Sequence, residues 1–140
     1  MEMVLDSSVA LAWVLPDETS SRADRLLAKL PRESVLWVPA LWWYEVANAL
    51  TVAQRRRRLP QRDRARAIEL YGTLPVRTDA ALDAHALWRF HVLAEEHGLS
   101  AYDAAYVELA QRKGLRFATF DQRLAMAARR AGVRMMGLKG

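Results

Sequence analysis

The chain has 140 residues, of which 52% are apolar and 26% are charged. This balance is typical of a globular protein and excludes intrinsic disorder. We expect one domain over residues 1–140, long enough to bury a core without disulfides, which the absence of cysteine excludes. The net charge of +5 favours a polyanionic partner, either a nucleic acid or an acidic protein segment.

No apolar run reaches the length of a membrane span, and the first residues lack a basic stretch followed by an apolar one. We therefore expect a cytoplasmic protein without a membrane segment. The chain also has no glycine-rich phosphate-binding loop and no His-Glu-x-x-His motif, so it predicts no nucleotide cofactor and no zinc-peptidase site.

Five short apolar runs predict strands, and apolar residues at helical spacing predict helices between them. The strands are expected at 3–5, 35–38, 76–78, 116–119 and 133–136. The helices are expected after Asp6, at 20–30, from Pro39 to the arginines at 55–58, from Pro60 to about 74, at about 80–97, at 100–113 and from Asp121. Strands that alternate with helices predict a three-layer α/β/α fold with a central parallel sheet.

Ser100 followed three residues later by Asp103 is typical of a capping box at the start of a helix. Tyr102, Tyr106 and Leu109 recur at helical spacing, which predicts that they share the buried face of that helix. A role as a helix cap would by itself explain Asp103.

Three further acids follow the predicted strands. Asp6 comes directly after the first strand, Asp121 after the fourth, and Glu45 in the second turn of the helix after the second strand. The carboxyl ends of parallel strands meet at one sheet edge, so connectivity predicts these three acids there. Asp103 joins them only if its helix begins at the same edge.

Asp6, Asp103 and Asp121 each have helix capping as an alternative role. Glu45 lies in a segment that is apolar on nearly every face, so it needs a partner, either an arginine or a metal ion. Four carboxylates within ~5 Å of one another repel by about 3 kcal/mol per pair at an effective dielectric near 20, unless protons or a divalent cation intervene. Ligands that are all oxygen favour Mg²⁺ or Mn²⁺, and that arrangement suits metal-assisted phosphodiester hydrolysis.

Four segments each contain one of these acids: VLDSSVALAW at 4–13, YEVANAL at 44–50, LSAYDAAY at 99–106 and FATFDQRL at 117–124. Together they resemble a PIN-domain ribonuclease, most closely a VapC-type toxin of a toxin–antitoxin pair, over essentially the whole chain. The family's acidic positions fall on Asp6, Glu45, Asp103 and Asp121. The resemblance implies a parallel sheet of about five short strands. It also implies that these acids bind Mg²⁺ or Mn²⁺ and that an activated water attacks the RNA phosphodiester.

The resemblance also implies further residues and partners. Ser8, Asn48 and Thr119 match polar positions near the acids, although Ser8 suits helix capping equally well. The implied partners are an RNA substrate, a second copy of the chain in a homodimer, and a cognate antitoxin whose carboxyl-terminal segment covers the acidic site.

The densest basic run has several possible roles. Its arginines could form a solvated helix end, contact RNA phosphates, or contact the antitoxin or the dimer mate. The run consists of Arg55, Arg56, Arg57 and Arg58. The adjacent Trp42 and Trp43 cannot share a helix face, so we expect one in the core and the other towards a partner surface.

Other functions compete with the nuclease. A phosphatase or receiver-like domain with Asp6 as phospho-acceptor needs a second acid beside it and a suitably placed lysine, whereas Ser7 and Ser8 follow Asp6 and lysine is scarce. A PIN-like module that binds a nucleic acid or a protein without cleavage would be favoured by an incomplete acid set. An RNA-processing nuclease outside a toxin–antitoxin pair is a further alternative.

Overall fold

The structure is a computed structural model that describes residues 1–18 and 20–138. Among these residues, a four-stranded parallel sheet in the order β3-β2-β1-β4 forms the centre. The strands are β1 (Glu2–Leu5), β2 (Val35–Pro39), β3 (Val76–Asp79) and β4 (Arg116–Ala118). Met3, Val4 and Leu5 in the inner strand β1 are fully buried, as expected for a parallel strand covered on both faces.

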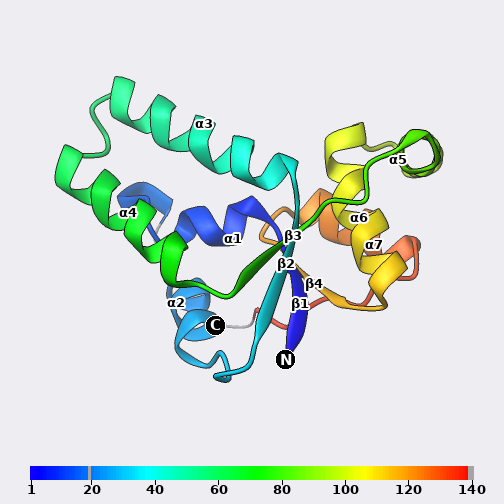
Figure 1. The fold of residues 1–140 in the computed structure, drawn as a ribbon, viewed down its shortest axis with the longest axis horizontal. Helices are drawn as coiled ribbons and strands as arrows, with labels where there is room; N and C mark the ends of the chain where they lie inside the picture. Colours follow the sequence, from blue (N-terminus) through cyan, green and yellow to red (C-terminus); the bar gives the residue numbers. More distant parts are fainter. Residues whose placement is uncertain (19, 139–140) are drawn as a thin grey trace.

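Helices cover both faces of this sheet (Figure 1). On one side lie α1 (Ser7–Ala12), α2 (Ser21–Ala28), α3 (Leu41–Arg55) and α4 (Gln61–Thr73), with the 3-10 helix η1 (Pro16–Glu18) after α1. On the other side lie α5 (Ala84–His97), α6 (Ala101–Lys113) and α7 (Gln122–Arg130). The predicted three-layer α/β/α fold is therefore confirmed. None of the helices in the described part of the chain combines the length and apolar character needed to cross a bilayer.

The fifth predicted strand is wrong for the residues that the structure describes. In place of a strand at 133–136, a single parallel bridge joins Met135 to Phe117. Two backbone hydrogen bonds hold it, from Phe117 N–H to Arg134 over 2.9 Å and from Met136 N–H to Phe117 over 2.8 Å. Because β4 is only three residues long, few backbone groups on its outer edge are available to pair with a further strand.

Two predicted helix starts are also displaced. Pro39 is the last residue of β2, in register with Asp79 of β3, and α3 begins two residues later at Leu41. The missing N–H of proline is tolerated at a strand end. The helix expected from about residue 80 begins at Ala84 because Asp83 caps it, accepting the N–H of Ala86 over 2.7 Å.

The two tryptophans separate as expected, but Tyr102 does not pack as predicted. Trp42 is fully buried, whereas Trp43 is 41% exposed and donates its indole N–H to Thr78 over 2.8 Å. Tyr102 is 69% exposed, although Tyr106 on the same predicted face is fully buried. In α6, burial begins after the first turn, which leaves Tyr102 uncovered.

Candidate active site

Asp6 and Thr119 are neighbours because the strands before them pair in parallel. Leu5 at the end of β1 is in register with Ala118 at the end of β4, so the next residue of each strand emerges at the same sheet edge. The backbone N–H of Asp6 donates to the carbonyl oxygen of Ala118 over 2.9 Å. The pairing of these two strands therefore fixes the position of Asp6.

The Asp6 carboxylate is buried and accepts hydrogen bonds from two hydroxyl groups. Thr119 donates to its Oδ2 over 2.6 Å and Ser8 donates over 2.7 Å, while the residue is only 6% exposed. Burial raises the pKa of Asp6 and the charge of Asp121 adds to the rise, while the two hydroxyls oppose it. Asp6 occupies the N-cap position of α1, but its side chain makes no capping hydrogen bond of the kind that Asp121 makes in α7.

The same two hydroxyls hold the loop that contains Asp121. Ser8 Oγ accepts the N–H of Phe120 over 3.1 Å, and Thr119 Oγ1 accepts the N–H of Asp121 over 3.0 Å. Asp121 is the N-cap of α7, where its Oδ1 accepts a backbone N–H of the first turn over 3.1 Å. Asp121 therefore has the capping role considered for it, and this role holds its charge close enough to act on Asp6.

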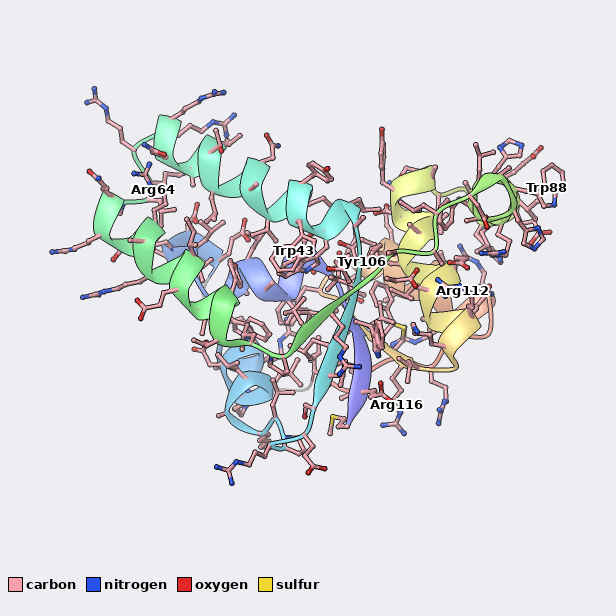
Figure 2. The ribbon with its side chains drawn as sticks, viewed as in Figure 1. Trp43, Arg64, Trp88, Tyr106, Arg112 and Arg116 are labelled. Carbon is pink, nitrogen blue, oxygen red and sulfur yellow. The ribbon has the colours of Figure 1, made fainter. Side chains whose placement is uncertain are left out.

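Glu45, half-buried in the second turn of α3, has a tyrosine as its partner. The Tyr106 hydroxyl donates to Glu45 Oε1 over 2.5 Å and thereby joins α6 to α3 near the middle of the molecule (Figure 2). The buried Tyr106 ring stacks on Phe117 of β4, with ring centroids 5.6 Å apart. Burial raises the pKa of Glu45, the hydroxyl opposes this rise, and the charges of Asp6 and Asp103 add to it.

Asp103 lies in the first turn of α6 but does not cap that helix. Ser100 is the N-cap, and its Oγ accepts the N–H of Asp103 over 3.1 Å. In the described residues the Asp103 carboxylate itself accepts no hydrogen bond within the protein. Burial raises the pKa of Asp103, as do the charges of Asp6 and Asp121, whereas Arg123 lowers it. The helix therefore begins at the same sheet edge as the other acids.

Two clefts adjoin at Asp103. One, of about 370 Å³, lies beside α7, and the other, of about 530 Å³, lies between the first turns of α3 and α6. The polar residues of the first are His97, Ser100, Asp103, Asp121, Arg123 and Arg130. The second is lined by Leu41, Tyr44, Glu45, Asn48, Ser100, Tyr102 and Asp103. Three of the four acids therefore line an open surface, and Asn48 lies there with them.

The acids suit a hard divalent cation in ligand type and in charge. Carboxylate oxygens are the ligands that Mg²⁺ and Mn²⁺ prefer. The pKa of Asp6, of Glu45 and of Asp103 is each raised by the charge of another acid of the set, and a cation would relieve this repulsion. In the conformation of the described residues, no three acidic or histidine side chains are close enough to one another to hold a metal ion. Binding would therefore require the carboxylates to draw together.

The arginine run lies apart from the acids. Arg55 ends α3, ten residues beyond Glu45, which corresponds to about 15 Å along a helix. Arg58 forms an ion pair with Asp17 of η1 over 2.5 Å, while Arg56 and Arg57 are exposed. The structure therefore does not bring this run to the acidic edge.

Sequence reasoning missed two residues of the site. Helical spacing predicts only a core position for Tyr106, although a buried tyrosine hydroxyl needs a partner and the half-buried Glu45 is available. Arg123 lies beside the acids and lowers the pKa of Asp103, but no pattern in its exposed helix turn distinguished it from other arginines.

Comparison with known proteins gives consistent matches. The PIN domain family matches residues 3–130. Ribonuclease VapC3 of Pyrobaculum aerophilum is 34% identical over 131 residues, covering 89% of this chain and 93% of that protein. The crystal structure of the Mycobacterium tuberculosis sarcin-ricin loop cleaving toxin VapC20 aligns with a TM-score of 0.58 and 25% identity, over 89% of this chain and 94% of that one. A VapBC2 structure from Rickettsia felis, bound to promoter DNA, aligns with a TM-score of 0.67 and 9% identity, over 97% and 98% of the chains.

Proposed function

The chain belongs to the PIN domain family and is of its VapC type, and we propose that it is a metal-dependent endoribonuclease toxin. Relatives named as ribonucleases support the reaction, and the VapC20 likeness supports RNA as the substrate class. The observation on which the proposal rests is the arrangement of four carboxylates from separate elements whose charges act on one another at one sheet edge. The four are Asp6, Glu45, Asp103 and Asp121.

We propose these four acids as the ligands of Mg²⁺ or Mn²⁺. When bound, such an ion neutralises charge on a phosphate and lowers the pKa of a water that attacks it. Ser8 and Thr119 fix the orientation of the Asp6 carboxylate, and Tyr106 fixes that of Glu45. These two carboxylates keep their orientation, so the movement that draws the acids together around an ion would fall mainly to Asp103, whose carboxylate accepts no hydrogen bond among the described residues.

Basic and polar residues of the two clefts complete the proposal. Arg123 and Arg130 line the cleft beside α7, where they would contact phosphates next to the one at the acids. Asn48 lines the other cleft and would donate a hydrogen bond to the substrate. The arginines at 55–58 would contact a more distant part of the RNA, the antitoxin or the dimer mate, or face solvent.

We also propose a cognate antitoxin as the partner that silences the enzyme, by covering the acidic edge. The family resemblance supports this partner, as it supports a homodimer and a place in the cytoplasm. The two clefts that contain Glu45, Asp103 and Asp121 are open at the surface and offer the antitoxin a direct route to the acids.

RNA cleavage by the purified protein tests the proposal. A single-stranded RNA is incubated with protein that has been stripped of metal by chelation, and then with added Mg²⁺ or Mn²⁺. We expect no cleavage after chelation and full recovery with either ion, because the four acids alone cannot activate a water. Cleavage that persists after exhaustive chelation would contradict the metal-dependent mechanism.

A further inference from the structure

Two exposed tyrosines flank the acids at the cleft between α3 and α6. Tyr44 is 77% exposed and Tyr102 is 69% exposed, and both line the cleft of about 530 Å³ that contains Glu45 and Asp103. They come from the first turns of α3 and α6, whose amino-terminal ends lie near each other at the same end of the sheet (Figure 1). One aromatic ring is therefore available from each of the two helices.

Each tyrosine directly precedes one of the acids in the sequence. Successive residues of a helix point about 100° apart, so when Glu45 and Asp103 face the acidic edge, Tyr44 and Tyr102 are turned towards its rim. Within the described residues, neither ring is part of the core and neither hydroxyl makes a hydrogen bond. Both rings are therefore available to a ligand that binds beside the acids.

An aromatic side chain at such a place matches the π-face of a nucleobase. A base in a duplex has both faces covered by its neighbours, whereas the bases of loops and single strands are free to stack on tyrosine. The cleft on the other side of Asp103 offers Arg123 and Arg130 instead, which suit phosphates. One side of the acids is therefore suited to bases and the other to the backbone.

Building on the nuclease function proposed above, we propose that Tyr44 and Tyr102 stack on unpaired bases beside the phosphate that is cleaved. A ring can stack only on a base with a free face, so this role requires the bases beside the cleaved phosphate to be unpaired. Tyrosines are also common in protein interfaces. The stacking role is favoured because both rings line the same cleft as two of the acids.

The test compares kinetics of Tyr44→Ala and Tyr102→Ala with those of the phenylalanine variants, which keep the ring. Substrates are an unstructured RNA and the same RNA annealed to its complement, both in Mg²⁺. Loss of one stacked base weakens binding of the RNA by roughly 5- to 150-fold. Each alanine variant should therefore lower kcat/KM by about that factor, mainly by raising KM. The phenylalanine variants should stay within about twofold of wild type, and all proteins should cleave the duplex poorly.

Trp88→Ala is the matched control, because Trp88 is 60% exposed but lies on α5 at the outer edge of the molecule, whereas Tyr106 of the site lies near the middle (Figure 2). It should leave kcat/KM unchanged. The proposal is overturned if the alanine variants cleave like wild type, which would leave the rings as a protein-contact surface. It is also overturned if phenylalanine is as harmful as alanine, or if duplex and single strand are cleaved equally.

A separate readout distinguishes failure of this proposal from failure of the nuclease function. A short RNA with 2-aminopurine is titrated with protein in Ca²⁺, and base stacking is followed by fluorescence quenching. Quenching by wild type that is lost in the two alanine variants supports stacking even if wild type cleaves no RNA. Equal quenching by wild type and both variants, or none by any protein, overturns stacking even if wild type does cleave.

Discussion

Asp6 and Asp103 are both acids of the candidate site, but the protein holds them in different ways. Asp6 is buried and accepts hydrogen bonds from Ser8 and Thr119, at the ends of two paired strands. Asp103 is partly exposed on the first turn of a helix, and in the described residues its carboxylate accepts no hydrogen bond. Asp6, with the Ser8 and Thr119 hydroxyls and the loop of Asp121 that they hold, is therefore the fixed half of the site. The half on α6, which contains Asp103, is free to adjust to a ligand.

The largest expected effect comes from removing the charge of the fixed half. Asp6→Asn should lower RNA cleavage by about 10³-fold, because a ligand to the proposed cation is lost. Its unfolding midpoint without metal should be equal or higher, since the amide oxygen accepts the same two hydroxyls and a buried charge is gone. Kinetics and urea unfolding measure both. Glu95→Gln, at an exposed acid of α5, is the control. A folded Asp6→Asn protein that cleaves within tenfold of wild type would contradict the assignment.

The pH dependence of stability distinguishes the two halves next. Raised carboxyl pKa values mean that, just above the ordinary carboxyl range, the folded protein binds more protons than the unfolded chain. Without metal, the free energy of unfolding should therefore fall as pH rises through this window and stay low above it. Mg²⁺ at a hundred times its Kd should restore about 2.7 kcal/mol at neutral pH and almost nothing near pH 4.

Thermal unfolding with and without Mg²⁺ across this pH range measures the effect. Asp6→Asn should flatten the pH dependence more than Asp103→Asn, because Asp6 is the more deeply buried acid. An equal slope in both variants and in wild type would show that these acids do not set the pH dependence.

Loss of a hydroxyl at the fixed half should have a smaller effect on stability. Thr119→Val removes a donor to Asp6 and the acceptor for the N–H of Asp121, in a residue that is 9% exposed. Unsatisfied buried groups of this kind cost about 1–3 kcal/mol, so the free energy of unfolding should fall by that amount. Thr119→Ser keeps the hydroxyl and should lose less than half as much. A loss in Thr119→Val that is no larger than the loss in Thr119→Ser would contradict the role given to the hydroxyl.

The smallest effect is expected at the link between the two helices. Tyr106→Phe removes the hydroxyl that lowers the pKa of Glu45 and leaves the ring stacked on Phe117. Stability should fall by about 1 kcal/mol. The acid limb of the pH profile of kcat/KM should move to higher pH, because Glu45 then ionises later. An unchanged acid limb would separate Tyr106 from the proposed chemistry.

The fixed half of the site was predictable from the sequence, and the adjustable half was only partly so. Asp6 and Asp121 follow strands whose parallel pairing is implied by the alternation of strands and helices, so connectivity alone placed them together. Asp103 depended on where α6 begins relative to the sheet, which local patterns do not specify. The Tyr106–Glu45 bond joins residues 61 apart in sequence, and only the packing of α6 near α3 brings them together.

The errors in the fold have the same origin. The apolar run at 133–136 is typical of a strand, but whether it pairs depends on the length of β4, which ends where the chain turns towards Asp121. Tyr102 is at the spacing of a buried face, but among the described residues the packing that buries Ala104 does not extend to Tyr102, which is 69% exposed. Periodicity reports a tendency to be buried, and the tertiary structure decides whether it is met.

A titration of Mn²⁺ into metal-free protein, followed by calorimetry, tests the central claim most directly, because it needs no RNA. Wild type should bind the ion at neutral pH, and each amide variant of the four acids should weaken that binding at least tenfold, while Glu95→Gln should bind like wild type. The variants are Asp6→Asn, Glu45→Gln, Asp103→Asn and Asp121→Asn. Undiminished Mn²⁺ binding in all four variants would contradict a shared cation site at this edge of the sheet.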